Sequence, residues 1–551
     1  MPLQMRLLTQ PRGSLMVPVS ALLAVAVLAP LAMLVWFAAQ AGTAHWSHLA
    51  SYVLPQALAN TALLLLGVGT LATLLGTGSA WLVTAYEFRG RRFLSWALLL
   101  PLAVPTYIVA YAYLDLLHPI GPLQTAVRAL LGYDNPRQFR LPDLRSLQGA
   151  IFVLGFVLYP YVYLTTRVMF MTQSANLLEA ARTLGATRRE TFLRVVLPMA
   201  RPAIAVGLSL ALLETLNDIG ASEFLGVQTL TVAVYTTWIT RSDLGGAAQI
   251  ALAMLVIVMG LILLERHGRN RQRFAGTQRM RPMQAERLRG MPAVAAFALG
   301  ALPVGIGFCA PAAYLVAESV KRIHLAGGVS THLLAGLGNT LIVATAATLL
   351  TLLCGLVVAW TTRSVQSGNG PGPVRALIRI ASLGYAVPGT VLAIGLLTPL
   401  LMIDRAWGFV TGHGGLFLMG SMTALVIAYT LRFLAISCGG IEAGLMRIPP
   451  ALEQASRLLG ETAAGTLRRV HLPLLRPALA ASAMLVFVDT MKELPITLLL
   501  RPMNFDTLAT LLYADAARGS YEEGAVAALA IVAAGLLPVI LLARTNLKMG
   551  R

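Results

Sequence analysis

Residues 179–198 read EAARTLGATRRETFLRVVLP, and residues 454–473 read QASRLLGETAAGTLRRVHLP. The two stretches align without a gap at a shift of 275 residues, and they share Leu-Gly near the middle and Leu-Pro at the end. Similarity at one fixed shift is the signature of an internal duplication. We therefore predict two copies of one structural unit.

The similarity extends toward the N-terminus of each copy when small gaps are allowed. The matching positions are Asn60-Thr61 with Asn339-Thr340, Trp81 with Trp360, and Ala103-Val104-Pro105 with Ala386-Val387-Pro388. Apolar runs of about the length that a helix needs to cross a bilayer follow the same division. Six occur in each half, at about 15–40, 58–86, 94–117, 147–171, 199–225 and 246–264, and at 291–317, 338–361, 376–402, 416–437, 474–500 and 522–543.

The composition agrees with a membrane protein, because 57% of the residues are hydrophobic and only 12% are charged. A soluble globular chain carries about 25% charged residues. We predict an all-α polytopic membrane protein with about twelve transmembrane helices, arranged as two parallel six-helix repeats. The predicted domains are residues 1–264 and 291–551, joined by a basic cytoplasmic linker over residues 265–290.

The charge distribution predicts the orientation. The net charge is +19, but the Lys and Arg residues lie in short loops, with no aromatic-interleaved basic face that would bind nucleic acid. Segments on the side of the N-terminus hold three times as many Lys and Arg residues as those on the opposite side. By the positive-inside rule, both termini and both repeated loops are cytoplasmic. The expected location is a bacterial inner membrane.

Each repeated loop predicts a short helix between two spans. Gly185 and Gly460 suit the end of a helix, and Pro198 and Pro202 suit the first turn of the span that follows the first loop. A single such loop is often only a turn that returns the chain to the membrane. Two copies at a fixed shift, both on one side, favour a shared function instead.

The loops resemble the signature of the membrane subunits of binding-protein-dependent ABC importers, a Glu-Ala-Ala, Gly, Ile-x-Leu-Pro cytoplasmic loop. The second copy departs from it, because Gln454-Ala455-Ser456 replaces the acidic triplet. The resemblance implies the type I importer permease fold and a loop that docks in a groove of the ATPase. The coupling residues that it implies are Glu179, Ala180, Ala181, Gly185, Leu197 and Pro198, with Gln454, Ala455, Ser456, Gly460, Leu472 and Pro473.

A second set of candidate residues lies in the helix after each loop. Carboxylates at i and i+4 share one helix face, and charges inside a span need an explanation. Two readings stay open: an external gate or pathway, and pairing between helices in which Lys492 neutralises a carboxylate. The candidates are Glu214, Asn217, Asp218 and Glu223 in the first copy, and Asp489, Lys492 and Glu493 in the second.

The stretches 217–227 and 229–238, with 492–495, 500–502 and 505–508, resemble the ferric-iron permease branch, in which both halves are fused in one chain. Hard oxygen ligands are compatible with ferric iron, but no metal site is assigned. Related fused permeases move thiamine, phosphonate or other anions, and these are alternative substrates. From a different class, a twelve-helix secondary transporter is the competing interpretation.

The resemblance also implies the partners. The chain contains no GxxxxGK[ST] motif, so it cannot cradle nucleotide phosphates and binds no cofactor of its own. We expect it not to be an enzyme, two separate ATPase subunits on the cytoplasmic side to use ATP, and an external solute-binding protein to deliver substrate. The expected mechanism is ATP-driven alternating access.

Overall fold

The computed structural model describes residues 16–41, 46–47, 49–133, 135–172, 181, 183–270, 285–367, 387–412, 415–520 and 523–549. Helices form nearly all of the regular structure in these residues, and the strands β1 (Tyr86–Glu87) and β2 (Glu286–Arg287) have two residues each. The predicted all-α class is confirmed. An α-helix satisfies its own backbone hydrogen bonds, which is what a bilayer core requires.

Ten helical segments of the described residues are long and apolar enough to cross a membrane. They contain α1 (Met16–Gln40), α3 (Leu54–Ala85), α7 (Leu147–Thr172), α10 (Leu197–Asn217), α13 (Leu244–Asn270), α14 (Met291–Val304) with α15 (Ala310–Ala326), α16 (Thr331–Ser367), α18 (Gly389–Thr411), α19 (Met422–Met446) and α22 (Leu472–Met491).

The other two of the twelve expected runs are helical as well, and one of them is bent. The run at 94–117 is a pair of helical segments, Arg91–Ala103 and Thr106–Leu116, bent by 91°. Pro105 lies at this break, and a proline both lacks an N–H and restricts the residue before it. The last run forms α25 (Ala525–Met549), a helix of 25 residues whose described part up to Ile540 is apolar.

Two further runs end earlier than expected. The run at 199–225 ends as a helix at Asn217 and continues as the short α11 (Gly220–Phe224), and the run at 474–500 ends at Met491 and continues as α23 (Pro495–Leu500). Each short helix leads through a loop to a ten-residue helix, α12 (Leu230–Ile239) or α24 (Leu508–Ala517). The two copies therefore share the order long helix, break, short helix, ten-residue helix.

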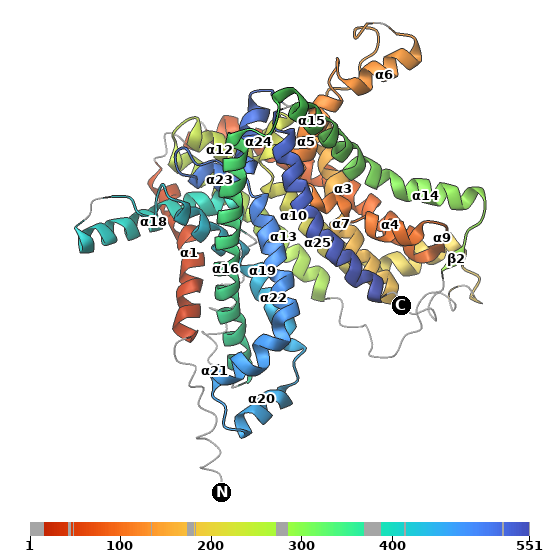
Figure 1. Cartoon of the computed structure of the whole chain (residues 1–551). Coiled ribbons are helices and arrows are strands. Elements are labelled where there is room, and N and C mark those ends of the chain that lie inside the picture. Colours follow the sequence, from red (N-terminus) through yellow and green to blue (C-terminus); the bar gives the residue numbers. More distant parts are fainter. Residues whose placement is uncertain are drawn as a thin grey trace. The chain divides into compact units, whose positions relative to one another are not determined.

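The two compact units of the molecule each draw helices from both sequence repeats. One unit contains α1, residues 244–252 of α13, and the elements from α16 to α23. Within it α1 packs against α16 and α18, and α16, α19 and α22 pack against one another (Figure 1). The compact units therefore do not follow the division of the sequence at residues 264 and 290.

The other unit contains the elements from α3 to α12, the rest of α13, α14, α15 and α25. Within it α14 packs against α3 and α4 (Arg91–Ala97), and α15 packs against α5 (Thr106–Leu116) and α25. Helices α3, α7 and α10 pack against one another, and a Cβ on Gly76 of α3 would lie 2.8 Å from the carbonyl oxygen of Tyr159 in α7. Small residues permit such close approach of membrane helices.

The predicted linker is partly structured. Helix α13 continues to Asn270, and Glu286 and Arg287 pair in parallel with Tyr86 and Glu87. The Arg287 guanidinium lies 3.0 Å from the Glu87 carboxylate. Residues 271–284 of the linker lie outside the described residues.

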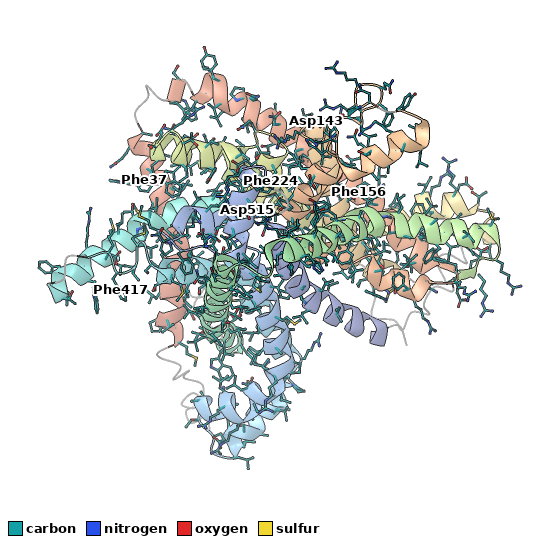
Figure 2. All side chains as sticks on the ribbon, turned by 45° about the horizontal axis from the view of Figure 1, so that its top comes forward. Phe37, Asp143, Phe156, Phe224, Phe417 and Asp515 are labelled. Atoms are coloured by element: carbon teal, nitrogen blue, oxygen red, sulfur yellow. The ribbon has the colours of Figure 1, made fainter. Side chains whose placement is uncertain are left out.

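Elements outside the spans are held by polar contacts. The buried carboxylate of Asp404 in α18 accepts hydrogen bonds from the backbone N–H groups of Phe417, Leu418 and Met419, at 2.7–3.1 Å. Figure 2 labels Phe417 in this segment. A short helix, α6 (Pro122–Leu131), precedes α7 in the chain, and Asp143, labelled in Figure 2, lies between the two helices in sequence.

Candidate functional site

The repeated loops share a turn at the glycine. Gly185 and Gly460 have φ angles of +86° and +85°, and a Cβ at either position would meet no atom within 4 Å. The left-handed conformation, rather than lack of space, is the reason for glycine. Residues 173–180 and 182, among them the candidates Glu179 and Ala180, lie outside the described residues.

The chain beyond each glycine begins the next helix with a threonine cap. Thr187 and Glu190 form a capping box, in which the Thr187 N–H donates to Glu190 at 3.0 Å and the Glu190 N–H donates to the Thr187 hydroxyl at 3.3 Å. In the second copy the Gly465 N–H donates to the Thr462 hydroxyl at 3.1 Å.

The helix after each cap runs into the membrane without a stop. Helix α9 (Arg188–Thr191), the π-turn η3 (Phe192–Val196) and α10 are continuous, and so are α21 (Ala463–Thr466), η6 (Leu467–His471) and α22. We expected Pro202 in the first turn of the span, but it lies inside α10, while Pro198 is in the first turn. The π-turns ahead of Pro198 and Pro473 accommodate this continuity. Leu197 and Leu472 are the first residues of α10 and α22.

Exposed leucines precede both glycines in the chain. Leu184 is 88% exposed and Leu459 is 85% exposed, and the helix α20 (Pro450–Leu458) adds Leu458 at 88%. In the second loop Gln454 and Ala455 are exposed, whereas Ser456 is buried and its hydroxyl lies 2.9 Å from that of Thr466. Each loop therefore offers an apolar contact beside a fixed turn.

The second loop has a charged anchor. Glu453 of α20 lies 2.5 Å from Arg363 Nε of α16 and 2.9 Å from Nε2 of the fully buried His471. Arg363 also donates to the carbonyl oxygens of Leu445 and Ile448, and the His471 ring packs edge-on against Trp360. This anchor, which we did not predict from the sequence, ties α20 to two spans.

The opposite ends of α10 and α22 carry Asp218 and Glu493, which cap the two short helices. Asp218 accepts from the N–H groups of Ala221 and Ser222 at 2.7 and 3.3 Å. Glu493 accepts from those of Ile496 and Thr497 at 3.1 and 3.2 Å. A carboxylate at a helix N-terminus stabilises it by bonding to its free N–H groups. These two acids therefore have a structural role at each break.

Each of the two acids also has a side-chain partner from another element. Thr106, the first residue of α5, donates its hydroxyl to Asp218. Arg432 of α19 lies 3.0 Å from Glu493, and both side chains are at least 89% buried. A Cβ on Gly389, at the start of α18, would clash with the Arg432 guanidinium. Arg432 was visible in the sequence as a charge in an apolar run, but its partner was not.

The remaining candidates fall into separate contacts. Lys492 pairs with Asp489 at 2.8 Å, a contact three residues apart at the end of one helix rather than the pairing between helices that the sequence suggests. The Tyr513 hydroxyl donates to Glu223 at 2.7 Å. Glu214 and Asn217 are half-buried in the last two turns of α10. In each copy the candidates therefore lie at, or just beyond, the end of the long helix that is opposite the loop.

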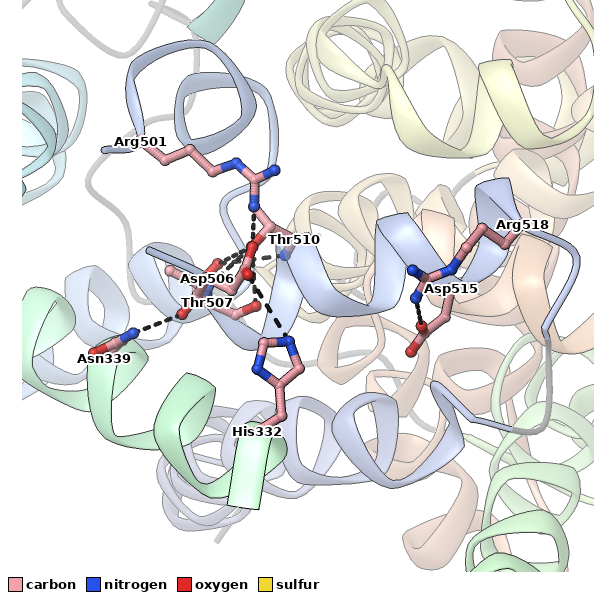
Figure 3. A network of polar contacts seen from close by, with 8 residues as sticks. All are labelled: His332, Asn339, Arg501, Asp506, Thr507, Thr510, Asp515 and Arg518. Carbon is pink, nitrogen blue, oxygen red and sulfur yellow. Dashed lines mark hydrogen bonds and ion pairs between the residues drawn. The ribbon is translucent and has the colours of Figure 1, made fainter. Parts of the chain in front are cut away.

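A polar network surrounds the start of α24 (Figure 3). Asp506 pairs with Arg501 and lies 3.9 Å from His332, and the Thr510 hydroxyl donates to it at 3.3 Å. The side chain of Asn339 donates to the Asp506 carbonyl oxygen at 3.0 Å. No group of three or more His, Cys, Asp or Glu side chains suited to a metal ion occurs within the described ranges.

The first copy repeats the backbone part of this network. The Asn60 side chain donates to the Gln228 carbonyl oxygen at 3.1 Å, and the Leu230 N–H donates to the Thr61 hydroxyl at 2.9 Å. In the second copy the Leu508 N–H donates to the Thr340 hydroxyl, also at 2.9 Å. The Asn-Thr pairs seen as repeats in the sequence thus hold the start of α12 and of α24.

A duplicated, all-α, multi-pass unit, with a helix-glycine-helix loop before one span and a capped break after it, defines a membrane permease. The chain belongs to the family of binding-protein-dependent transport system inner membrane components, which matches residues 72–273 and 353–547. It is the permease subunit of an ABC importer, and membership of this family implies an ATPase and a binding protein as partners.

Two relatives match nearly the whole chain. The Fe(3+)-transport system permease protein FbpB 2 of Haemophilus influenzae is 25% identical over 89% of this chain and 90% of its own length. A probable ABC transporter permease protein, y4fN, of Sinorhizobium fredii is 26% identical over 90% and 88%. The molybdenum transport system permease protein ModB of Escherichia coli is 30% identical over 37% of this chain and 89% of its own length.

Proposed function

We propose that this chain forms the translocation pathway of an ABC importer for ferric iron. The observation that supports iron is the match to the ferric-iron permease over nearly the full length of both chains. The match to the molybdenum permease covers about a third of this chain, as does the match to a putative 2-aminoethylphosphonate transport system permease protein of Salmonella paratyphi A. Oxyanions are therefore the second class of candidate substrate.

We assign the repeated loops to the cytoplasm, with both termini on the same side, and we propose that each loop binds one ATPase subunit. The exposed leucines beside Gly185 and Gly460 would supply the apolar contact. Glu179 of the first loop would add a charge that Gln454 does not supply in the second. The Glu453 anchor compensates by fixing α20 to its own spans.

In this mechanism, closure of the ATPase dimer moves the loops, and the long helices carry the movement. Helix α22 runs without interruption from Leu472 to Met491, about 30 Å at 1.5 Å per residue. It joins the loop to the Glu493 cap at its other end. Movement of the loop would therefore shift the break before α23 and change access to the pathway. ATP hydrolysis by the partner resets it, and this chain itself binds no cofactor.

Uptake by proteoliposomes tests the substrate. The chain would be reconstituted with the ATPase and the solute-binding protein of the same organism, with ATP inside and labelled ferric iron outside. We expect ATP-dependent accumulation of iron, and none of molybdate or 2-aminoethylphosphonate. Accumulation of either oxyanion without iron would refute the iron assignment, and uptake driven by an ion gradient without ATP would refute the importer mechanism.

Bulky substitutions test the loops. Gly185→Trp and Gly460→Trp should reduce co-purification of the ATPase, because the side chain would occupy the exposed surface beside the turn. Gly132→Trp is the matched control, because Gly132 also has a positive φ (+75°) and open space around its Cβ position but follows α6, on the opposite side in the proposed topology. Normal ATPase association of both loop variants would contradict the docking assignment.

A further inference from the structure

Two tyrosines at equivalent positions of the two sequence repeats lie against each other. Tyr235 is the sixth residue of α12, and Tyr513 is the sixth residue of α24. Their rings meet edge to face, with centroids 6.4 Å apart. Both helices start from the same Asn-Thr contacts described above, so the equivalence is structural as well as a matter of sequence.

Contact between equivalent residues locates a point shared by the two repeats. Equivalent residues of two related copies can touch only next to the axis that relates the copies. In transporters built from parallel repeats, substrate sites lie at the interface of the repeats. The Tyr235–Tyr513 contact is therefore a place where a translocated solute would pass.

A carboxylate from only one repeat adjoins this pair. Glu223 of α11 accepts the Tyr513 hydroxyl at 2.7 Å, and Phe224, next to it in the chain, stacks on the Tyr513 ring with centroids 5.7 Å apart. Glu223, Tyr235 and Tyr513 are all half-buried rather than sealed in the core. The cluster is therefore open to a solute on at least part of its surface.

The three side chains offer only oxygen donors. Phenolate and carboxylate oxygens are hard ligands, which favour hard cations over soft ones. A carboxylate also disfavours an oxyanion at the same place, because two negative charges in a partly dry site repel each other strongly. The chemistry of this cluster thus favours a trivalent cation over molybdate or a phosphonate.

We propose that Tyr513, Tyr235 and Glu223 form a transit site for the ferric ion on the translocation pathway. This inference rests on the proposed function. As iron arrives, the O–H bond of Tyr513 breaks, its proton moves to Glu223 Oε2, and the phenolate oxygen binds iron. The Tyr235 hydroxyl oxygen is the second donor. When iron leaves, the proton returns from Glu223 to Tyr513, so the cycle consumes no other reactant.

Visible absorption tests the site directly, because iron(III) bound to a phenolate gives a ligand-to-metal charge-transfer band. Ferric nitrilotriacetate would be added to the purified chain in nanodiscs. We expect the band in the wild type, its loss in Tyr513→Phe and a weaker band in Tyr235→Phe. Tyr133→Phe is the control, because Tyr133 follows α6 and is 41% exposed. No band in the wild type, or an unchanged band in Tyr513→Phe, would overturn the proposal.

Glu223→Gln separates a proton acceptor from a structural partner. The amide still accepts the Tyr513 hydrogen bond but cannot take up its proton, so the band should appear only at higher pH than in the wild type. A band with the same pH dependence would contradict the assigned role of Glu223.

Transport distinguishes failure of this site from failure of the proposed function. The Tyr235→Phe/Tyr513→Phe variant, which keeps both rings, should take up iron at least about tenfold more slowly, with ATPase activity still stimulated by the binding protein. If the wild type takes up iron and the double variant does so at the same rate, the transit site is refuted and the assignment as an iron importer stands. A wild type that carries no iron would refute the proposed function, and the absorption experiment would still decide whether the site binds iron.

Discussion

At the scale of residues, the two copies solve one structural problem in two ways. Each needs a carboxylate to cap a short helix inside the membrane region, and that carboxylate needs a partner. The first copy uses Thr106 with Asp218. The second uses Arg432 with Glu493, and Gly389 at the position of Thr106 leaves room for the guanidinium. The eleventh residue of α19 is Arg432, and the eleventh residue of α7 is Val157.

We expect Arg432→Val to destabilise the protein by about 3–5 kcal/mol, because it leaves Glu493 buried without its cation. The triple variant Gly389→Thr/Arg432→Val/Glu493→Asp, which installs the residues of the first copy, should recover much of this loss. Thermal unfolding in detergent would measure both. Arg405→Val, on the exposed side of α18, is the control for loss of a positive charge.

Equal Tm values for the single and triple variants would show that the two sites are not interchangeable. A single variant as stable as the wild type would show that the Arg432–Glu493 pair contributes nothing net. In that second case, the hydrogen bonds that cap the short helix would by themselves offset the cost of burying Glu493.

At the scale of elements, the turn of each loop depends on one backbone conformation. Since Gly460 has open space around its Cβ position, Gly460→Ala should cost about 1 kcal/mol from the left-handed backbone alone. Gly460→Asn should cost less than Gly460→Val, because asparagine visits this conformation more readily than a β-branched residue. Hydrogen exchange of the amides in α20 would report the order. The same cost for asparagine and valine would contradict this explanation.

The anchor of α20 predicts a different effect from that of the exposed loop surface. Glu453→Gln removes the anion between Arg363 and His471, so α20 should loosen from α16 and α22, at a cost of roughly 1–3 kcal/mol. We expect the ATPase still to bind but its stimulation by the binding protein to fall several-fold. Gln454→Glu is the neighbouring control, because Gln454 is exposed. Unchanged stimulation in Glu453→Gln would show that the anchor does not transmit movement.

The sequence predicted the elements better than their contacts. The 275-residue shift located both loops and matched Asp218 with Glu493, because a duplication preserves spacing. It could not show that Thr106 and Arg432 are their partners, because these come from other helices and are themselves different in the two copies. The bend at Pro105 had a visible signal in its prolines. The contact of Glu453 with His471 had no signal in the sequence, because the equivalent residues of the first copy, Leu178 and Val196, are apolar.

At the scale of the whole molecule, the two sequence repeats and the two compact units do not coincide. Apolar periodicity identifies helices but not their neighbours, so the expected six-helix domains follow the order of the chain. In the structure, α1 packs with α16 and α18 of the second repeat, while α14, α15 and α25 pack in the unit that contains α3, α7 and α10. A chain with only one of the two sequence repeats could therefore not supply all the helices of either compact unit.

Because each compact unit contains helices from both repeats, we expect that neither repeat folds stably alone. A fragment of residues 1–270 would lack α14, α15 and α25, and a fragment of residues 285–551 would lack α1. Each fragment should therefore expose helix surfaces that are packed in the whole chain. We expect each to aggregate or to be degraded. Co-expression of the two fragments should restore a complex that purifies as one species and supports ATP-dependent uptake, because the cut falls between helices. Protease resistance and size-exclusion profiles of each fragment, alone and together, would measure this. A stable, monodisperse 1–270 fragment would mean that the repeats are independent domains and that the exchanged helices contribute little to stability.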